Sequence, residues 1–427
     1  MGRRVFRTIF LSTALLGALV APARAHAFMV PNDTATMALQ PGPGGFVALA
    51  PVRLIDTRQG ANTPLAPNEA RLFTVTGVGA GSPPSHAGAV ALNITVINPD
   101  AGFLTVWPAD EPAPDTSVLN FDQNQTIANA VTLRVSAAGQ IALRSSAATN
   151  VIIDVLGWYA APAKSTDASG AIAVTPSPGG GFFGLHPTRL LDTRTVGKLA
   201  ANQGRGLMVL PPIDLAGTQV AAAVLNVTAV DADQDGFASV VAWGDDPLAV
   251  SAVNFSAHHG AVANQVTARV GPGNTVMLYA SASTHVLVDL MGFYTQGSTV
   301  PGGFTAVPSQ RLMDTRPTGV RGNASYSIAS DTWDLGVAGT AGVPTAAAAV
   351  IVNLTALMPS RSGHFAVWPD GQGRPPTSSL NVARGTVRAN AVTVGLGSND
   401  GVHIFTDTDA AFLVDVAGWF RSPFVAL

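Results

Sequence analysis

Cysteine is absent from the 427-residue sequence, so disulfide bonds, thiol catalysis and cysteine-ligated zinc are excluded. Charged residues make up only 11% of the chain, which argues against a highly charged disordered protein. Two residues that favour helix surfaces are nearly missing, with 2 Lys against 21 Arg and 2 Glu against 24 Asp. Because the 44 glycines, 30 prolines and many Asp residues are typical of turns, this composition predicts an all-β protein. A net charge of −3 gives no basic surface, so no nucleic-acid partner is expected.

Residues 1–27 have the pattern of an export signal. Arg3, Arg4 and Arg7 precede the apolar run IFLSTALLGALVAP, and small residues in A-x-A spacing follow within 23–27. The run is too short for a transmembrane helix, and the later sequence contains no second candidate. We therefore expect a secreted, extracellular protein without a transmembrane segment in its mature chain, exported by a general secretory or a twin-arginine route. The mature protein is then either soluble or associated with the cell surface.

Three repeats occupy the rest of the sequence. They begin with GGFVALAPVRLIDTR at Gly44, GGFFGLHPTRLLDTR at Gly180 and GGFTAVPSQRLMDTR at Gly302, and they close on VIIDVLGWY, VLVDLMGFY and FLVDVAGWF. Such self-similarity predicts repeated structural units. The expected organisation is a signal peptide at 1–27, a flexible segment at 28–43, repeat domains at 44–160, 180–295 and 302–427, and Pro-, Gly-, Ser- and Ala-rich linkers at 161–179 and 296–301.

Strand-like runs, about eight in each repeat, are separated by Gly, Pro, Asn and Asp. Segment 91–96 alternates apolar residues with small or polar ones, which is typical of a half-buried strand. No segment shows a helical period with caps. The repeats are therefore predicted to be three tandem β-sandwich domains of the jelly-roll type.

The motifs P-x-R-L-[ILM]-D-T-R, G-F-x-x-V-W-P, L-N-F and V-D-V-x-G-W-F together resemble the RLLDTR-motif repeat of secreted proteins from actinobacteria and other high-GC bacteria. The resemblance covers residues 44–421. It implies an exported, surface-associated accessory module. It identifies no catalytic residue and no established activity.

Four charged positions are identical in the three repeats. They are Arg53, Asp56, Arg58 and Asp154 in the first repeat, Arg189, Asp192, Arg194 and Asp289 in the second, and Arg311, Asp314, Arg316 and Asp415 in the third. Asp154 lies within an apolar run, and a buried carboxylate needs a partner, for which arginine is best suited. We expect Arg58 or Arg53 to pair with Asp154 or Asp56 and to tie the first strand of the repeat to its last. A cluster that binds a polar ligand is the alternative.

Three asparagine positions are also identical in the repeats. They are Asn93, Asn226 and Asn353, then Asn120, Asn254 and Asn381, and then Asn129, Asn264 and Asn390. The first set lies in N-x-T triplets that resemble glycosylation sequons. Because these triplets fall within predicted strands, we interpret the asparagines as structural.

Tryptophans mark a candidate ligand-binding surface. Trp107 and Trp368 stand at predicted strand ends, each directly before a proline, on a face that we expect to be partly exposed. Trp243 is a third candidate, although it lies two residues further from its strand glycine than Trp107 does. An exposed indole ring can stack on sugar rings, by analogy with base stacking. The alternative is a ring folded under the following loop or packed between domains.

The segment DADQDG resembles the start of a calcium loop through Asp231, Asp233 and Asp235. Ala242 stands where an acidic ligand is expected at the twelfth position, so a polar hairpin turn is the alternative. No other cofactor is predicted.

Motifs of conventional catalysis are missing from the sequence, which has no HExxH, GxSxG or P-loop pattern. We therefore predict a non-catalytic, multivalent surface module for adhesion that binds cell-wall or extracellular polysaccharide. The alternative is a structural or assembly protein of the cell surface, whose β domains pack on each other, on copies of the chain or on other surface proteins. An unrecognised hydrolase ranks third.

Overall fold

A computed structural model describes residues 44–60, 63–97, 100–160, 164–166, 172–174, 179–211, 219–258, 260–297, 303–316 and 329–421. The predicted signal peptide and the segment 28–43 lie outside these residues, as does most of the two predicted linkers. Within the described ranges, no helix has the length and apolar character needed to cross a membrane. The linker predicted at 161–179 contains a short two-stranded hairpin, β9 (Lys164–Thr166) and β10 (Ile172–Val174).

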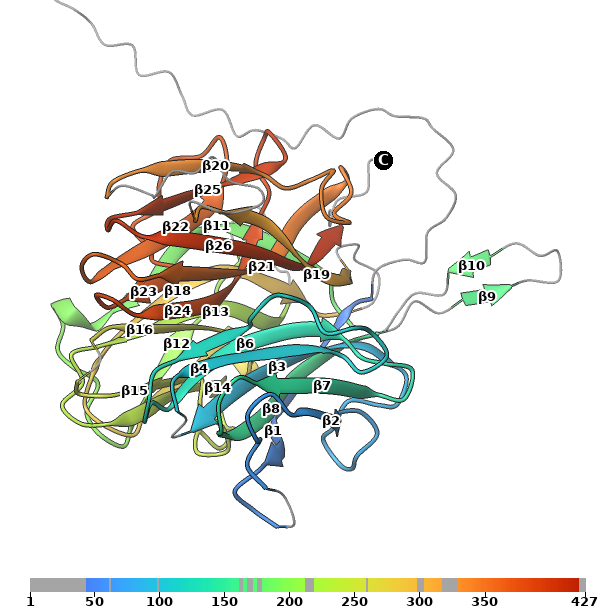
Figure 1. Cartoon of the computed structure of the whole chain (residues 1–427), viewed down its shortest axis with the longest axis horizontal. Coiled ribbons are helices and arrows are strands. Elements are labelled where there is room, and N and C mark those ends of the chain that lie inside the picture. Colours follow the sequence, from blue (N-terminus) through green and yellow to red (C-terminus); the bar gives the residue numbers. More distant parts are fainter. Residues whose placement is uncertain are drawn as a thin grey trace, which may run out of the picture. The chain divides into compact units, whose positions relative to one another are not determined.

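Each repeat contributes one sheet built mainly of long strands and one built of shorter strands, which we call the long-strand and the short-strand sheet (Figure 1). The long-strand sheets, in spatial order, are β1 (Phe46–Asp56), β8 (Asn150–Ala160), β3 (Ala87–Ile97) and β6 (Ile127–Arg134); β11 (Phe182–Asp192), β18 (His285–Thr295), β13 (Val220–Val230) and β16 (Val262–Arg269); and β19 (Phe304–Asp314), β26 (Ala411–Arg421), β21 (Ala347–Leu357) and β24 (Val387–Gly395).

The short-strand sheets follow the same order in every repeat. They are β2 (Ala70–Thr74), β7 (Gln140–Ser145), β4 (Gly102–Pro108) and β5 (Leu119–Phe121); β12 (Gln203–Met208), β17 (Thr275–Ala280), β14 (Gly236–Ala242) and β15 (Val253–Phe255); and β20 (Thr332–Gly336), β25 (Gly401–Thr406), β22 (Gly363–Pro369) and β23 (Leu380–Val382).

The all-β prediction is confirmed, but the prediction of three tandem β-sandwich domains is wrong. The six small antiparallel sheets form a six-bladed β-propeller, with two sheets from each repeat. All the described residues belong to one compact unit, and one hydrophobic cluster contains residues of all three repeats. The predicted boundaries of the three repeats stay predictions.

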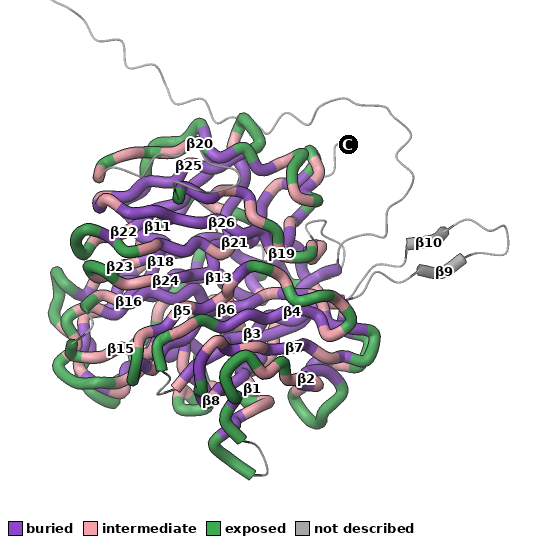
Figure 2. Tube along the Cα trace, in the orientation of Figure 1, coloured by how far each residue is buried: buried purple, intermediate pink, exposed green. Residues whose placement is uncertain are grey.

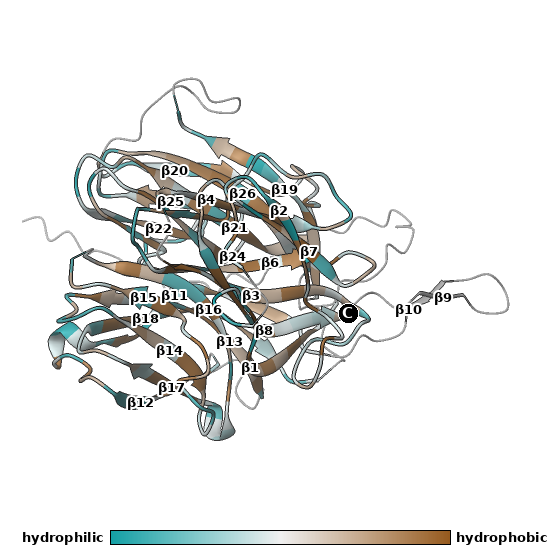
Figure 3. Cartoon of the chain, turned by 60° about the horizontal axis from the view of Figure 1, so that its bottom comes forward, coloured by the Kyte–Doolittle hydropathy of each residue, from teal (hydrophilic) through white to brown (hydrophobic). Residues whose placement is uncertain are grey.

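The strands β3, β13 and β21 of the long-strand sheets are buried on both faces, which explains why the chain does not divide into sandwiches (Figure 2). On β3, the side chains of Leu92 and Ile94 pack into the core of the first repeat. The opposite face carries Ala91, Asn93 and Thr95, which are also buried. Ala91 belongs to the cluster shared with the second and third repeats. Apolar residues concentrate in the strands and hydrophilic residues in the connecting loops (Figure 3).

Six buried aromatic rings meet where the opening strands of the repeats converge. They are Phe46, Tyr159, Phe182, Tyr294, Phe304 and Phe420. The hydroxyl oxygens of Tyr159 and Tyr294 lie 2.6 Å apart, and burial raises the pKa of both groups well above the ordinary value. Backbone hydrogen bonds also join Phe46 to Gly180 and Gly44 to Phe304. The first repeat is therefore tied to both of the others.

Candidate functional site

The shared charged residues form the same two ion pairs in each repeat. Arg53 Nε lies 2.8 Å from Asp154 Oδ1, and Arg58 Nη2 lies 2.7 Å from Asp56 Oδ2. The sequence left the choice of partners open, and the structure joins the first strand to the last through the earlier arginine. The equivalent strand-joining pairs are Arg189–Asp289 at 2.6 Å and Arg311–Asp415 at 2.8 Å, and the equivalent local pairs are Arg194–Asp192 at 2.7 Å and Arg316–Asp314 at 2.6 Å.

The two carboxylates of a repeat have different electrostatic environments. Burial raises the pKa of Asp154, against the opposing effect of its hydrogen bond from Arg53. The hydrogen bond from Arg58 instead lowers the pKa of Asp56 below its usual value. The same bond in the second repeat, from Arg194, lowers the pKa of Asp192 to about 2.

The strand-joining ion pair lies beside the contact between one repeat and the next. Arg53, Asp154 and Asn93 are register neighbours across β1, β8 and β3. From the second repeat, Asn264 Nδ2 donates to Asn93 Oδ1 at 2.9 Å, and Asn93 Nδ2 donates to the Ser251 carbonyl at 2.6 Å. We call each such contact between repeats a junction.

The same asparagine contacts build all three junctions. Between the second and third repeats, Asn390 donates to Asn226 at 2.9 Å, and Asn226 donates to the Ser378 carbonyl at 2.6 Å. Between the third and first, Asn129 donates to Asn353 at 3.0 Å, and Asn353 donates to the Ser117 carbonyl at 2.8 Å. The three junctions therefore close a circle.

Side-chain oxygens of Asn129, Asn264 and Asn390 complete the junctions by accepting backbone hydrogen bonds from Ala391, Ala130 and Gln265, respectively. The set of Asn120, Asn254 and Asn381 acts locally, since each of these accepts a hydrogen bond from the serine three residues earlier. The other two asparagine sets thus hold the repeats together.

Trp107 and Trp368 are only 8% and 3% exposed, so the expected partial exposure of these two rings is wrong. Trp368 packs with Phe405 and donates its Nε1 hydrogen to the Gln372 carbonyl at 2.9 Å, which places the ring under the following loop. Trp107 lies outside the core cluster of its repeat, and the Arg144 guanidinium carbon stands 5.9 Å from its ring centre.

Trp243 is 53% exposed and is not the counterpart of Trp107. Trp107 is the register partner of Ala142, and Val241 holds the same place in the second repeat, opposite Met277. Trp243 lies two positions after Val241, past the end of β14 and close to Gly206 of β12.

The three carboxylates of the candidate calcium loop do not form a common site. Asp233 pairs with Lys198, and Asp235 accepts a backbone hydrogen bond from Ala257 at 3.2 Å. Asp231 has a φ of 51°, as expected at a tight turn. Among the residues that the structure describes, no three or more His, Cys, Asp or Glu side chains are placed to hold a metal ion.

A cleft of about 620 Å³ lies at the junction between the third and first repeats. The first repeat contributes Trp107 and the prolines of the loop that follows it. The third contributes parts of β19, β21 and β26. Principal lining residues are Trp107, Pro108, Pro112, Pro114, Arg134, Ala306–Ser309, Ile351–Asn353, Asp415 and Ala417.

The charged groups in the wall of this cleft are already paired. Arg134 lies within hydrogen-bond distance of both Asp110 and Glu111, and Asp415 is held by Arg311. The remaining wall is mostly apolar, with Trp107 as its aromatic side chain. Sequence reasoning identified Trp107, but not the cleft, because its walls come from residues that are far apart in the sequence.

A second hollow, of about 870 Å³, lies between the first and second repeats. Its lining includes five glycines, and its aromatic residue, Phe46, is buried. We therefore take the cleft at Trp107 as the candidate site.

No protein-family model matches the chain, and no curated protein matches it. One similar solved structure is the N-terminal CBM22-1-CBM22-2 tandem domain of Paenibacillus barcinonensis Xyn10C, with 11% identity, coverage of 56% of this chain and 98% of that chain, and a TM-score of 0.16. Another comes from the Sulfolobus Turreted Icosahedral Virus, with 10% identity, coverage of 90% and 92%, and a TM-score of 0.18. At these TM-scores, neither likeness carries an argument about this chain.

Proposed function

We propose that the protein is an exported, non-catalytic surface module that binds cell-wall or extracellular polysaccharide. The cleft walled by Trp107 is the observation that supports this function. Its volume of about 620 Å³ falls in the range of about 300–1,000 Å³ that is usual for small-ligand sites. Sugar rings present apolar C–H faces, which pack well against an indole ring and proline side chains.

The carboxylates near the cleft support binding rather than hydrolysis. Glycoside hydrolysis needs two carboxyl groups that flank the bond and differ in protonation. Here Asp415 is held by two hydrogen bonds from Arg311, and Glu111 accepts hydrogen bonds from Arg134. Neither carboxylate is available as a general acid or base.

The assembly alternative has one observation in its favour, since the repeats do pack on each other. That packing closes within a single chain, through three equivalent junctions. The asparagine-lined faces are therefore covered in the folded chain, and they offer nothing to a second copy. We prefer polysaccharide binding for this reason.

Affinity electrophoresis of the full chain through gels that contain purified polysaccharides tests this proposal. Retardation is expected with at least one cell-wall or extracellular polymer. Trp107→Ala should weaken it by about tenfold or more, since the substitution removes the aromatic part of the cleft wall, and a loss of about 1.4 kcal/mol in binding free energy is tenfold in affinity. Trp243→Ala is the matched control, because Trp243 is exposed outside the cleft. If folded Trp107→Ala protein is retarded like the wild type, the assignment to this cleft is wrong.

A further inference from the structure

The three junctions differ at one residue in the last strand of each repeat. This strand contains a β-bulge, where the register to the neighbouring strand skips one position. The skipped residue is Leu156 in β8, Met291 in β18 and Ala417 in β26. Because a bulge redirects the side chain of its extra residue, these three positions are the most direct comparison between the junctions.

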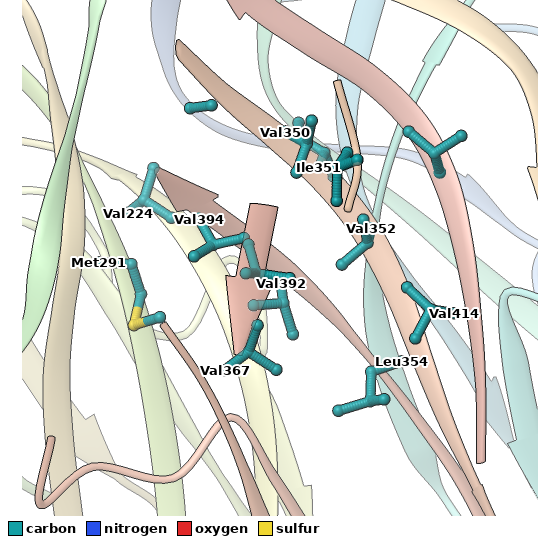
Figure 4. Close-up of a cluster of buried hydrophobic side chains, with 14 of the residues drawn as sticks. Val224, Met291, Val350, Ile351, Val352, Leu354, Val367, Val392, Val394 and Val414 are labelled. Atoms are coloured by element: carbon teal, nitrogen blue, oxygen red, sulfur yellow. The ribbon is translucent and has the colours of Figure 1, made fainter. Parts of the chain in front are cut away.

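Leu156 and Met291 fill their junctions. Leu156, from the first repeat, is 4% exposed and belongs to the hydrophobic cluster of the second repeat. Met291, from the second repeat, is 2% exposed and belongs to the cluster of the third. Figure 4 shows Met291 and Val224 of the second repeat beside Val367, Val392 and Val394 of the third.

Ala417 leaves the corresponding space open. Its methyl group packs against the cluster that contains its own repeat, and it is not part of the first repeat's cluster. Ala417 is partly exposed and lines the cleft that also contains Trp107. A leucine or methionine at this position has three more side-chain atoms, and replacement of such a residue by alanine characteristically leaves a cavity.

The charged groups of the wall restrict the kind of ligand that this cleft can bind. Asp110, Glu111 and Asp415 outnumber Arg134 and Arg311 among the ion-paired groups in and beside its wall. These arginines are occupied by carboxylates, so the described wall offers a uronate, phosphate or sulfate no ready counter-ion. An uncharged sugar avoids the cost of burying an unpaired charge.

We infer that Ala417 makes the third-to-first junction the ligand site, so that each chain binds one uncharged sugar segment there rather than three. This inference deepens the proposed function and rests on it for the identity of the ligand. Leu156 and Met291 fill the equivalent position at the other two junctions, and neither side chain lines the hollow between the first and second repeats. Ala417 is thus a specificity-determining position.

Thiol labelling tests the opening of the junction without any ligand. Because the chain has no cysteine, Ala417→Cys, Leu156→Cys and Met291→Cys each introduce a unique thiol into the full protein. We expect a small methanethiosulfonate reagent to modify Ala417→Cys at least about tenfold faster than the other two, since thiol reactivity follows access. Equal rates in variants that melt like the wild type would overturn the inference.

Filling the cleft tests the ligand. Ala417→Met introduces the residue that the second repeat already has at this position. Binding of the neutral polysaccharide that retards the wild type should fall by about tenfold or more, with the melting temperature kept or raised. Ala201→Met, at an exposed turn, is the matched control. Undiminished binding by folded Ala417→Met would overturn the inference and leave the proposed function standing.

Calorimetric titration with an oligosaccharide of the same neutral polymer completes the test. One site per chain is expected, and three sites would contradict the inference. Tighter binding of a uronic-acid polymer than of the neutral one would contradict the assignment of an uncharged ligand. If no polysaccharide binds the wild type, the proposed function fails, while the labelling rates still decide whether this junction is the open one.

Discussion

Asn264 donates a hydrogen bond of 2.9 Å to the side-chain oxygen of Asn93, and these residues lie 171 positions apart, in different repeats. Both side chains are buried. A buried amide that loses its partner costs free energy, so each of the two residues depends on the other repeat for its stability. We therefore expect the three repeats to fold and unfold as one unit.

Asn93→Ala should lower the stability of the whole chain. The substitution removes hydrogen bonds to Ser251 and Asn264, and the expected loss is about 1–3 kcal/mol. Because the repeats share a core, calorimetry should show one transition at a lower temperature rather than an early step from the first repeat. Asn399→Ala, at an exposed turn, is the control. A separate first-repeat transition would contradict the shared core.

Asp154→Ala should be more damaging, because it leaves the Arg53 guanidinium without its buried partner. Breaking such a pair from one side costs about 3–5 kcal/mol. Asp289→Ala should cost less than Asp154→Ala, because Arg189 keeps a second carboxylate partner, Asp192, at 3.3 Å. Urea denaturation measures both variants, and equal or reversed losses would argue against this ranking.

The tyrosine pair predicts a non-additive result. Tyr159→Phe leaves the buried Tyr294 hydroxyl without its partner and should cost about 1–3 kcal/mol. Tyr159→Phe combined with Tyr294→Phe removes both hydroxyls and should be nearly neutral, because Phe420 already occupies the equivalent place in the third repeat. A double-mutant cycle by thermal melts measures the coupling, and simple additivity would disprove it.

Threonine hydroxyls at the same position in the three repeats should be dispensable. The Oγ1 atoms of Thr95, Thr228 and Thr355 are buried and have no hydrogen-bond partner. Thr95→Val keeps the shape and removes a poorly satisfied polar group, so stability should stay equal or rise by about 1 kcal/mol. Thr95→Ser, which keeps the hydroxyl and loses a methyl group, should be less stable than the wild type. Chemical denaturation of the two variants decides between these outcomes.

Acid should weaken the protein partly through Asp192. Its pKa falls from 3.8 to about 2 on folding, chiefly through the hydrogen bond from Arg194. A carboxyl whose pKa is lower in the folded state contributes stability above about pH 4, and this contribution is lost as the pH falls towards about 2. Asp192→Asn should therefore flatten the pH dependence of the urea midpoint in this window. Curves that run parallel to the wild type would contradict this role.

Strand positions within a repeat could be predicted from the sequence, because alternating side chains and glycine or proline breaks are local signals. The burial of the second face of β3 could not be predicted in this way. Ala91, Asn93 and Thr95 are small or polar and look like a solvent face, yet they are covered by another repeat. Hydrogen bonds between repeats leave no periodic trace in the sequence, so three tandem domains were expected in place of one closed body.

The candidate site was predictable only in part. Trp107 could be predicted as a candidate from its place at a strand end before Pro108. Its exposure could not, because this depends on which distant segments of the chain cover the indole ring. For Trp368 the cover is the loop that contains Gln372, and for Trp107 the surroundings include the third repeat. The proposed role of Ala417 could not be predicted from the sequence. Leu156, Met291 and Ala417 are all apolar, and only the β-bulge shows that they occupy the same position at the three junctions.

The closed circle of junctions also has a consequence for the folding of the chain. Asn353 bonds to the Ser117 carbonyl across 236 residues, and Gly44 exchanges backbone hydrogen bonds with Phe304. Because a protein is synthesised from its N-terminus, all strands of the first repeat have been synthesised long before Phe304 and Asn353 of the third repeat. Contacts this distant slow folding and leave apolar faces uncovered in the meantime. We therefore expect a newly made first repeat to expose apolar surface, and to need a chaperone, until the third repeat has been synthesised.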